Sequence, residues 1–154
     1  MTRIERTNSE NQDFVLLVRN LDAYLAEIDG DDHVFYDQFN KIGLIKYAVV
    51  VYEDKSPIGC GAIKEFDPKT MEVKRMFVSP ESRSMGIATR ILAELEKWAA
   101  QLGCERCVLE TGRNQPHAIA LYKKNGYTSI PNYGQYVGIA NSVCFEKLLI
   151  TRKS

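Results

Sequence analysis

Three runs rich in β-branched and aromatic residues, between positions 45 and 78, constrain the fold more than any other feature of the sequence. The runs cover residues 45–53, 58–66 and 71–78, and each is joined to the next by a short polar turn that contains a proline. Short turns between such runs favour antiparallel hairpins. The sequence therefore predicts an antiparallel meander of three strands in the middle of the chain.

Helical periodicity precedes this meander. Apolar residues recur there at steps of three and four, which is typical of an amphipathic helix ending at Gly30. The residues of this stripe are Phe14, Leu17, Val18, Leu21, Tyr24, Leu25 and Ile28. Asp31 and Asp32 then resemble the cap of a second short helix, over residues 31–39, and residues 2–6 are expected to form a short strand.

After the meander, helical and strand patterns alternate. The segments are a helix over 87–102, a strand over 107–110, a helix over 116–125, and strands over 127–130 and 142–150. This order predicts an α/β fold with a mixed, mostly antiparallel, twisted sheet of about six to seven strands. About four helices are expected to flank the sheet, on both of its faces.

Composition narrows the class of protein. The 154 residues are 45% hydrophobic, which suits a single domain over residues 1–154. Twenty basic residues balance twenty acidic ones, so we expect no general binding to nucleic acid. The longest apolar or aromatic stretch, 47–52, is much shorter than the roughly 20 residues that span a bilayer. No apolar segment follows the basic start, so we expect no membrane partner and a cytoplasmic location.

Four cysteines raise the question of metal or redox chemistry. Cys104 and Cys107 form a C-x-x-C pair, whereas Cys60 and Cys144 are isolated. Zinc would need two further ligands, and the sequence has no second paired motif. Cys107 also lies in an apolar strand pattern, where cysteine behaves as a small hydrophobic residue. We therefore expect reduced, buried thiols and no metal.

The segment 78–88 is the strongest candidate for a binding site. A strand ends at Pro80, and a polar loop leads through Gly86 into a long helix. Such a loop directs unpaired backbone N–H groups toward one point, where the helix dipole adds positive potential. A diphosphate fits there, and Arg83 can add a charge-assisted hydrogen bond. An ordinary strand–helix connection with a surface arginine would show the same residues.

Two motifs connect the sequence to a known family. Arg83-x-x-Gly86-x-Ala88 resembles the Arg/Gln-x-x-Gly-x-Gly/Ala signature of the GNAT superfamily, the Gcn5-related N-acetyltransferases. Downstream, Ala118-x-x-Leu121-Tyr122-x-x-x-Gly126-Tyr127 resembles the family's second characteristic stretch. One helix and one strand separate the motifs, as in the family. The resemblance covers residues 45–130 closely and the N-terminal helices loosely.

This resemblance implies the GNAT fold and transfer of an acetyl group from acetyl-CoA to an amine. It implies that the diphosphate of coenzyme A lies on the loop and that the pantetheine arm pairs with the strand before it. A bulge in that strand would open the cleft for the arm. The implied cofactor-binding residues are Met76, Phe77, Val78, Arg83, Ser84, Met85, Gly86, Ile87, Ala88, Thr89, Gln115 and Tyr122.

Two positions depart from the family pattern. Ser84 stands where the family usually has glycine, and a positive φ there would cost a serine about 1 kcal/mol or more. Gln115 stands where an asparagine commonly follows the fifth strand. Its amide can still contact the cofactor arm.

The resemblance also implies catalytic roles. The N–H of Met76 would stabilise the oxyanion, and Tyr122 would donate a proton to the departing thiolate. Glu72 is the favoured general base, since it lies eleven residues before Arg83. Strand alternation would also place it on the same face as Met76. Glu110 and ordered water are the alternatives.

The acceptor is less defined. In the family it lies between the N-terminal helices and a C-terminal loop, which correspond here to residues 29–36 and 131–136. Their carboxylates and aromatic rings could hold a cationic amine, but a solvated cap and ordinary loop tyrosines fit equally. We expect a small-molecule or peptide amine as partner, and the apolar end 143–150 would permit a homodimer. A non-catalytic acetyl-CoA-binding regulatory module and a different nucleotide-binding α/β domain remain alternative functions.

Overall fold

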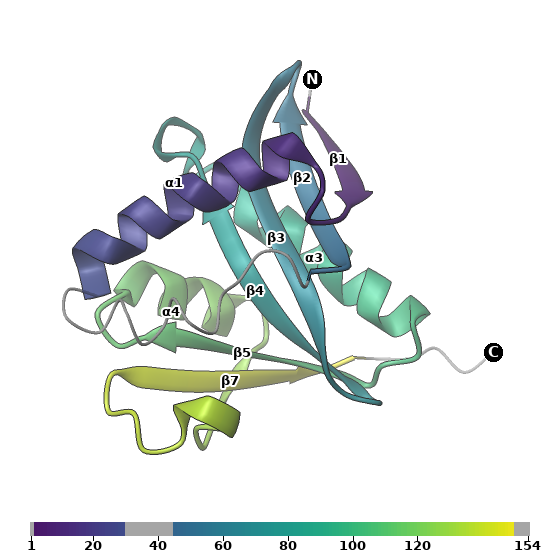
Figure 1. The fold of residues 1–154 in the computed structure, drawn as a ribbon. Coiled ribbons are helices and arrows are strands. Elements are labelled where there is room, and N and C mark those ends of the chain that lie inside the picture. The colour runs from purple at the N-terminus through teal and green to yellow at the C-terminus, as the bar shows by residue number, and fades with distance from the viewer. Residues whose placement is uncertain (1, 30–44, 150–154) are drawn as a thin grey trace.

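A single mixed β-sheet with helices on both faces forms the protein (Figure 1). The computed structural model describes residues 2–29 and 45–149. Helix α1 crosses one face of the sheet, and helices α3 and α4 lie on the other.

The elements follow one another in an order that matches the sequence pattern closely. They are β1 (Thr2–Thr7), α1 (Gln12–Asp29), β2 (Tyr47–Glu53), β3 (Ser56–Asp67), β4 (Thr70–Val78), the 3₁₀ turn η3 (Pro80–Ser82), α3 (Ile87–Gln101), β5 (Arg106–Gly112), α4 (Pro116–Lys124), β6 (Thr128–Ile130), the 3₁₀ turn η4 (Gly134–Tyr136) and β7 (Ser142–Leu148).

The seven strands lie in the order β1-β2-β3-β4-β5-β7-β6. All neighbouring pairs are antiparallel except β4 and β5, which are parallel. The predicted α/β fold and mixed sheet of six to seven strands are confirmed. Three α-helices lie in the described ranges, against about four expected. The second N-terminal helix, predicted over 31–39, falls outside the described residues.

Two apolar cores hold the helices on the sheet. Phe14 and Leu17 of α1 pack against one face, in a cluster that includes Val50 of β2. Ile91 and Leu95 of α3 belong to the cluster on the opposite face. Both helical stripes predicted from the sequence are therefore the buried faces of their helices.

The glycines inside β3 allow this close packing. A Cβ placed on Gly61 would lie 2.7 Å from both Cγ2 of Ile91 and Sδ of Met76. A Cβ placed on Gly59 would lie 3.2 Å from both Cδ1 of Ile91 and the backbone oxygen of Phe77. Side chains of α3 and the backbone of β4 therefore both approach β3 at its glycines.

Strand β4 has one extra residue where it passes Gly61 of β3. The register runs from Cys60 opposite Phe77 to Ala62 opposite Lys74, so two steps on β3 correspond to three on β4. Arg75 lies at this β-bulge, with a left-handed φ of 59°. The bulge that the resemblance implied is therefore present, although no local sequence signal predicts it.

The bulge reverses the alternation of side chains along β4. Met71 and Val73 face the α3 side before it, whereas Met76 faces that side after it. Glu72 therefore faces the α1 side. The expectation that Glu72 and Met76 share one face of the sheet is wrong, because the extra residue between them shifts the two-residue period by one.

Strands β4 and β5 separate just before the bulge. Their pairing covers only Thr70, Met71 and Glu72 of β4, opposite Arg106, Cys107 and Val108. Strand β5 nevertheless continues to pair with β7 as far as Gly112. Figure 1 shows the two strands meeting at one end and diverging toward α4. The split between β4 and β5 therefore lies inside the sheet rather than at its edge.

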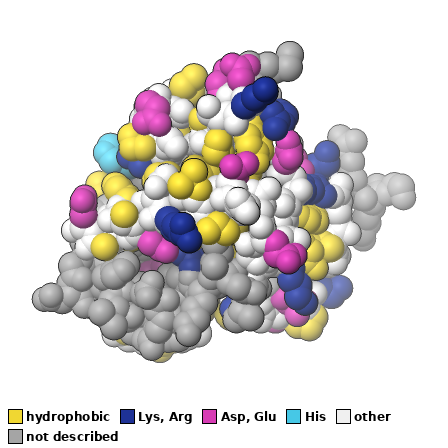
Figure 2. Space-filling model, turned by 45° about the horizontal axis from the view of Figure 1, so that its top comes forward, with side chains coloured by type: hydrophobic (Ala, Val, Ile, Leu, Met, Phe, Trp, Pro, Cys, Tyr) yellow, Lys and Arg dark blue, Asp and Glu magenta, His cyan; other side chains and the backbone are white. Residues whose placement is uncertain are grey.

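Figure 2 shows acidic and basic side chains interspersed over the face in view. None of the described helices has the combination of length and hydropathy that a bilayer crossing requires.

Candidate active site

A cavity of about 130 Å³ opens where β4 and β5 diverge. Helix α1 covers it from one side of the sheet and α4 from the other. Its lining consists of Leu21, Leu25, Glu72, Val73, Lys74, Arg75, Met76, Glu110, Thr111, Gly112, Gln115, Ala118, Tyr122 and Tyr136. Five sequence-predicted residues, which are Glu72, Met76, Glu110, Gln115 and Tyr122, thus lie together around one cavity.

The loop from β4 to α3 presents backbone N–H groups. The first hydrogen bond of α3 runs from the Arg90 N–H to the Gly86 carbonyl. Helix geometry therefore leaves the three preceding N–H groups, of residues 87–89, without a helical acceptor. Ser84 and Gly86 have left-handed φ values of 68° and 75°, which turn the chain into the helix. The helix N-terminus is the positive end of its dipole, so this loop favours an anion.

Arg83 packs against the end of β4 in this structure. Its Nε donates to the Val78 carbonyl at 3.0 Å. Its guanidinium carbon lies 5.2 Å from the ring centroid of Tyr24 and 5.8 Å from that of Phe77. To bind a diphosphate as predicted, the exposed Arg83 side chain would have to release the Val78 carbonyl, or donate to that carbonyl and to the diphosphate at the same time.

Backbone groups of β4 face the opening. The Ser79 N–H donates to the Ile58 carbonyl of β3 at 2.8 Å, whereas the Val78 carbonyl points the other way and meets Arg83. Peptide groups alternate along a strand, so those of Met76 point to the same side as Val78. The side chain of Phe77 is buried beneath α1, in the cluster with Phe14. Met76, Phe77 and Val78 can therefore contact a bound molecule chiefly through their backbone.

Tyr122 lies at the α4 wall of the cavity. The residue is 7% exposed, and its hydroxyl makes no hydrogen bond to the described part of the chain. Tyr127, a neighbour at 5.9 Å between ring centroids, instead donates its hydroxyl to Glu96. Burial, and then the charge of Glu110, raises the pKa of Tyr122 above its ordinary value. The hydroxyl is therefore protonated at neutral pH and is available as a donor.

Two carboxylates lie side by side on the α1 face of the split. Glu72 pairs with Val108 across the strands, and Glu110 follows two residues later on β5, so both share a face. The Tyr133 hydroxyl donates to Oε2 of Glu72, and Lys74 Nζ lies 3.5 Å from its Oε1. Glu72 is thus held in place from two directions.

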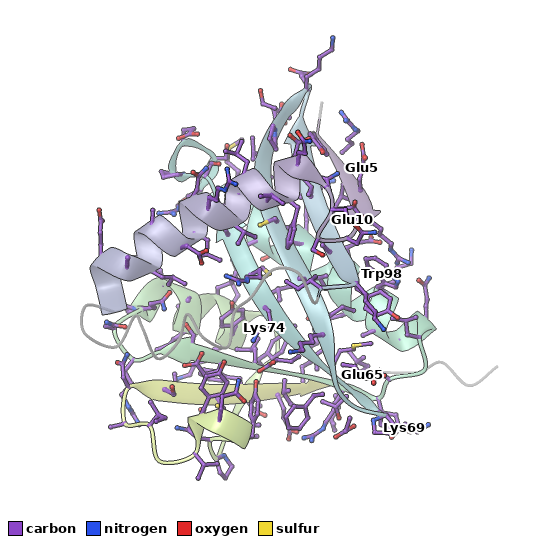
Figure 3. The ribbon with its side chains drawn as sticks, viewed as in Figure 1. Glu5, Glu10, Glu65, Lys69, Lys74 and Trp98 are labelled. Carbon is purple, nitrogen blue, oxygen red and sulfur yellow. The ribbon has the colours of Figure 1, made fainter. Side chains whose placement is uncertain are left out.

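Lys74 and Arg75 are the residues that the sequence analysis missed. Burial lowers the pKa of Lys74 below its usual value, and the nearby Glu72 charge opposes this shift. Figure 3 shows Lys74 on β4 beneath α1. Arg75 Nη1 forms an ion pair with Asp22 of α1 at 3.0 Å. Lys74 shares the face of Glu72 by strand alternation, and the bulge, which the sequence does not signal, turns Arg75 to the same face.

Gln115 lies at the α4 end of the cavity. It is the N-cap residue of α4, and Pro116 follows it at the first helical position. A Cβ placed on Gly112 would lie 3.4 Å from its Nε2. The Gln115 amide is therefore at the mouth of the split, where the predicted contact with a cofactor arm can occur.

The four cysteines are all buried and form no disulfide. Burial raises the pKa of the Cys107 thiol to about 12, which keeps this thiol protonated at neutral pH. No cluster of three or more metal-binding side chains occurs among the residues that the structure describes. Cys104 and Cys107 both pack in the apolar cluster beneath α3, so the C-x-x-C pair is part of the core.

Comparison with known proteins gives the same assignment as the geometry. A sequence model described as the acetyltransferase (GNAT) family matches residues 15–127. An IAA acetyltransferase of Azospirillum brasilense is 34% identical over 138 residues, which cover 88% of this chain and 90% of that protein. The chain therefore belongs to the GNAT family and is an acyltransferase.

Solved structures agree on the fold. A Klebsiella pneumoniae protein assigned to the acyl-CoA N-acyltransferases has a TM-score of 0.81 and 30% identity, over 97% of this chain and 99% of that one. The PaiA N-acetyltransferase of Thermoplasma acidophilum, solved with coenzyme A, has a TM-score of 0.68 at 18% identity, over 96% and 99% of the two chains. A purely regulatory module receives no support from these comparisons.

The left-handed Ser84 gives a first testable prediction. Replacement Ser84→Gly should raise the free energy of unfolding by about 0.5–1 kcal/mol, because relief of the Cβ strain exceeds the extra entropy of the unfolded glycine. Urea denaturation measures the change. Ser84→Ala is the matched control, since it removes the hydroxyl and keeps the Cβ, and it should not be stabilised. If the glycine variant is no more stable than the alanine variant, the Ser84 backbone is not strained by its Cβ.

Proposed function

We propose that this protein transfers the acetyl group of acetyl-CoA to the amine of a small molecule by direct attack. The observation that carries the proposal is the split between β4 and β5, which has Tyr122 on its cavity wall, while the N–H groups of the β4–α3 loop follow the end of β4. A long, thin cofactor with a diphosphate near one end and a thioester at the other matches this shape.

The loop residues 83–89 hold the diphosphate in this proposal. Their N–H groups and the dipole of α3 supply the attraction, so the protein needs no net positive charge. The pantetheine arm pairs with the backbone of Met76 and Val78, along the edge of β4 that no longer pairs with β5. Gln115, at the start of α4, contacts the arm from the opposite wall. Acetyl-CoA supplies the activated acetyl group.

The Met76 N–H stabilises the oxyanion that develops on the thioester carbonyl. The orientation of the β4 peptide groups supports this role, because Met76 and Val78 direct theirs into the split. A backbone donor on a strand held by two cores is already in place before the reaction, which is the condition for effective stabilisation.

Tyr122 donates the proton that the departing thiolate takes up. Its raised pKa keeps the hydroxyl protonated at working pH, and its place on the cavity wall gives it access to the reacting atoms. Tyr127 has the same residue type and similar burial, but its hydroxyl is committed to Glu96. Of the two tyrosines in this part of the core, Tyr122 alone lines the cavity.

A carboxylate of the Glu72–Glu110 pair accepts the proton of the attacking amine. Glu72 is the first choice, since Tyr133 and Lys74 fix its position at the cavity. Glu110 lies on the same face, two residues beyond the partner of Glu72, and can take the role through a water. Because of the bulge, the side chain of Met76 lies on the opposite face of the sheet from the two carboxylates. The backbone of Met76 still lies at the split that they line.

The acceptor therefore enters from the α1 side. Leu21 and Leu25 of α1 and Tyr136 of η4 form the wall there. Tyr133, from the loop after β6, packs edge-on against Phe66 at 5.1 Å between ring centroids and reaches Glu72. The expected acceptor segment 29–36 lies almost wholly outside the described residues.

Replacement Tyr122→Phe tests the proposal most simply. We expect kcat for acetyl transfer to fall by about 100-fold or more, because the departing thiolate loses its proton donor. The affinity for acetyl-CoA should change little. Thiol release with a panel of amines measures kcat, and calorimetry measures acetyl-CoA binding.

Tyr127→Phe is the matched control for this variant. It removes a buried hydroxyl from the same cluster, so it should lower stability without a comparable fall in kcat. An unchanged kcat in Tyr122→Phe would remove Tyr122 from the mechanism. Tight acetyl-CoA binding without turnover of any amine would instead indicate a regulatory module.

The general base gives a prediction in pH. At pH 7 an alkylamine is almost wholly protonated, because its conjugate acid has a pKa of about 10.4, as in lysine. Loss of the base, by Glu72→Gln or Glu110→Gln, should therefore lower kcat/KM strongly near pH 7 and progressively less as the pH approaches that value. Profiles of kcat/KM between pH 6 and 10 would identify which carboxylate acts.

Glu65→Gln, at an exposed glutamate of β3 (Figure 3), is the control and should leave the profile unchanged. If kcat/KM of a glutamate variant is lowered by the same factor at every pH, that glutamate only positions its neighbours. Normal profiles in both variants would assign the proton transfer to water.

A further inference from the structure

The bulge in β4 places two consecutive cations on the same side of the sheet. In a regular strand, Lys74 and Arg75 would point to opposite faces. Here Arg75 adopts a left-handed φ of 59° and reaches Asp22 of α1, while Lys74 reaches Glu72 on that same face. Both side chains line the cavity that the acceptor enters.

The guanidinium of Arg75 is only partly satisfied. Its side chain is 3% exposed, and Nη1 donates to Asp22 at 3.0 Å. Its Nε is buried and has no hydrogen-bond partner among residues 2–29 and 45–149. A buried N–H on a charged group is costly to leave without an acceptor. An acceptor oxygen supplied by a bound molecule in the cavity would remove that cost.

The charges of the lining indicate which molecule this is. Glu72 and Glu110 contribute two negative charges, and Lys74 and Arg75 contribute two positive ones. Asp22 of α1 already pairs with Nη1 of Arg75 and leaves Nε as the group without an acceptor. A simple alkylammonium would find the carboxylates but would also meet the two cations and leave Nε of Arg75 without an acceptor. A molecule with both an ammonium and a carboxylate complements all four side chains.

We infer that the acceptor is an α-amino acid, whose carboxylate binds Nε of Arg75 beside Lys74 while its amine faces Glu72 and Glu110. This inference rests on the proposed function and names its substrate class. The site carries opposite charges close together, with Lys74 Nζ 3.5 Å from Glu72 Oε1, which suits an α-amino acid better than a longer ω-amino acid. Leu21 and Leu25 give the side chain of the substrate an apolar wall.

The reaction balances without a further reactant. The amine nitrogen forms a bond to the thioester carbonyl carbon, and the C–S bond breaks. One ammonium proton passes to a carboxylate of the Glu72–Glu110 pair before the attack, and from there to solvent. The thiolate takes a proton from Tyr122, and the second nitrogen proton, released as the amide forms, restores the Tyr122 hydroxyl. The products are an N-acetyl amino acid and coenzyme A.

A paired substrate panel tests the inference. The twenty α-amino acids are each compared with the amine that lacks the carboxylate and with the amino-acid amide, using thiol release from acetyl-CoA. We expect kcat/KM for the best amino acid to exceed that of both matched amines by about 10- to 100-fold, the usual effect of a hydrogen bond to a charged group. Dipeptides, tested in the same assay, show whether a peptide N-terminus is accepted instead.

The variant Arg75→Gln tests whether Arg75 binds the carboxylate of the substrate. This variant should lose most of the discrimination between amino acid and matched amine, through a higher KM for the amino acid. The ratio is taken within one preparation, so any unfolded fraction cancels. Arg19→Gln, at an exposed arginine of α1, is the matched control and should keep the wild-type ratio.

Several outcomes would overturn the inference while leaving the proposed function intact. These are equal or faster turnover of amines without a carboxylate, turnover of peptides alone, or full discrimination in Arg75→Gln. Intact acetyl-CoA binding with no amino acid acetylated would also overturn it. Absence of acetyl-CoA binding would contradict the proposed function itself.

Discussion

One extra residue in β4 determines what the rest of this structure can do. The bulge at Arg75 lies just beyond the point where β4 stops pairing with β5, in the middle of a seven-stranded sheet. Strand β5 keeps its partner β7, and β4 keeps β3, so the sheet stays intact on both sides of the split. Backbone groups that would otherwise complete a ladder instead face an opening, where a ligand can pair with them.

The same residue divides the opening into two sides. After the bulge, the side chains of Met76 and Val78 face the core below α3, and their peptide groups point away from β3 toward the split. Before it, Glu72 and Lys74 face α1, and Arg75 joins them because its left-handed backbone turns it to that side. In the proposed function, donor and acceptor therefore approach the reacting atoms from opposite faces of one sheet. Tyr122 closes the opening from α4.

Most of the framework could be predicted from the sequence, because it depends on local signals. The helical stripes of α1 and α3, the proline-containing turns around β3, and Gly86 before α3 each specify their element within a few residues. The two family motifs singled out Tyr122, which lies on the cavity wall, and the loop whose N–H groups begin α3. Ser84 was recognised as the unusual position, and its φ of 68° shows that the backbone keeps the glycine-like conformation.

The site itself was only partly predictable. A β-bulge depends on how two strands align over many residues, and Arg75 carries no glycine to mark a left-handed position. The strict alternation assumed for Glu72 and Met76 therefore failed, and Lys74 and Arg75 were overlooked as lining residues. The contact of Tyr133 with Glu72 joins residues 61 positions apart and has no local signature. What the sequence could not reveal is concentrated on the α1 side, where the proposed acceptor enters.

A crystal structure of the protein with coenzyme A tests the account most directly. The account predicts that the diphosphate accepts hydrogen bonds from the N–H groups between Ser84 and Thr89, and that the pantetheine arm pairs with β4 at Met76 and Val78. The sulfur atom should then lie beside the Tyr122 hydroxyl. Coenzyme A bound away from this split, or β4 and β5 paired continuously past Glu72, would contradict it.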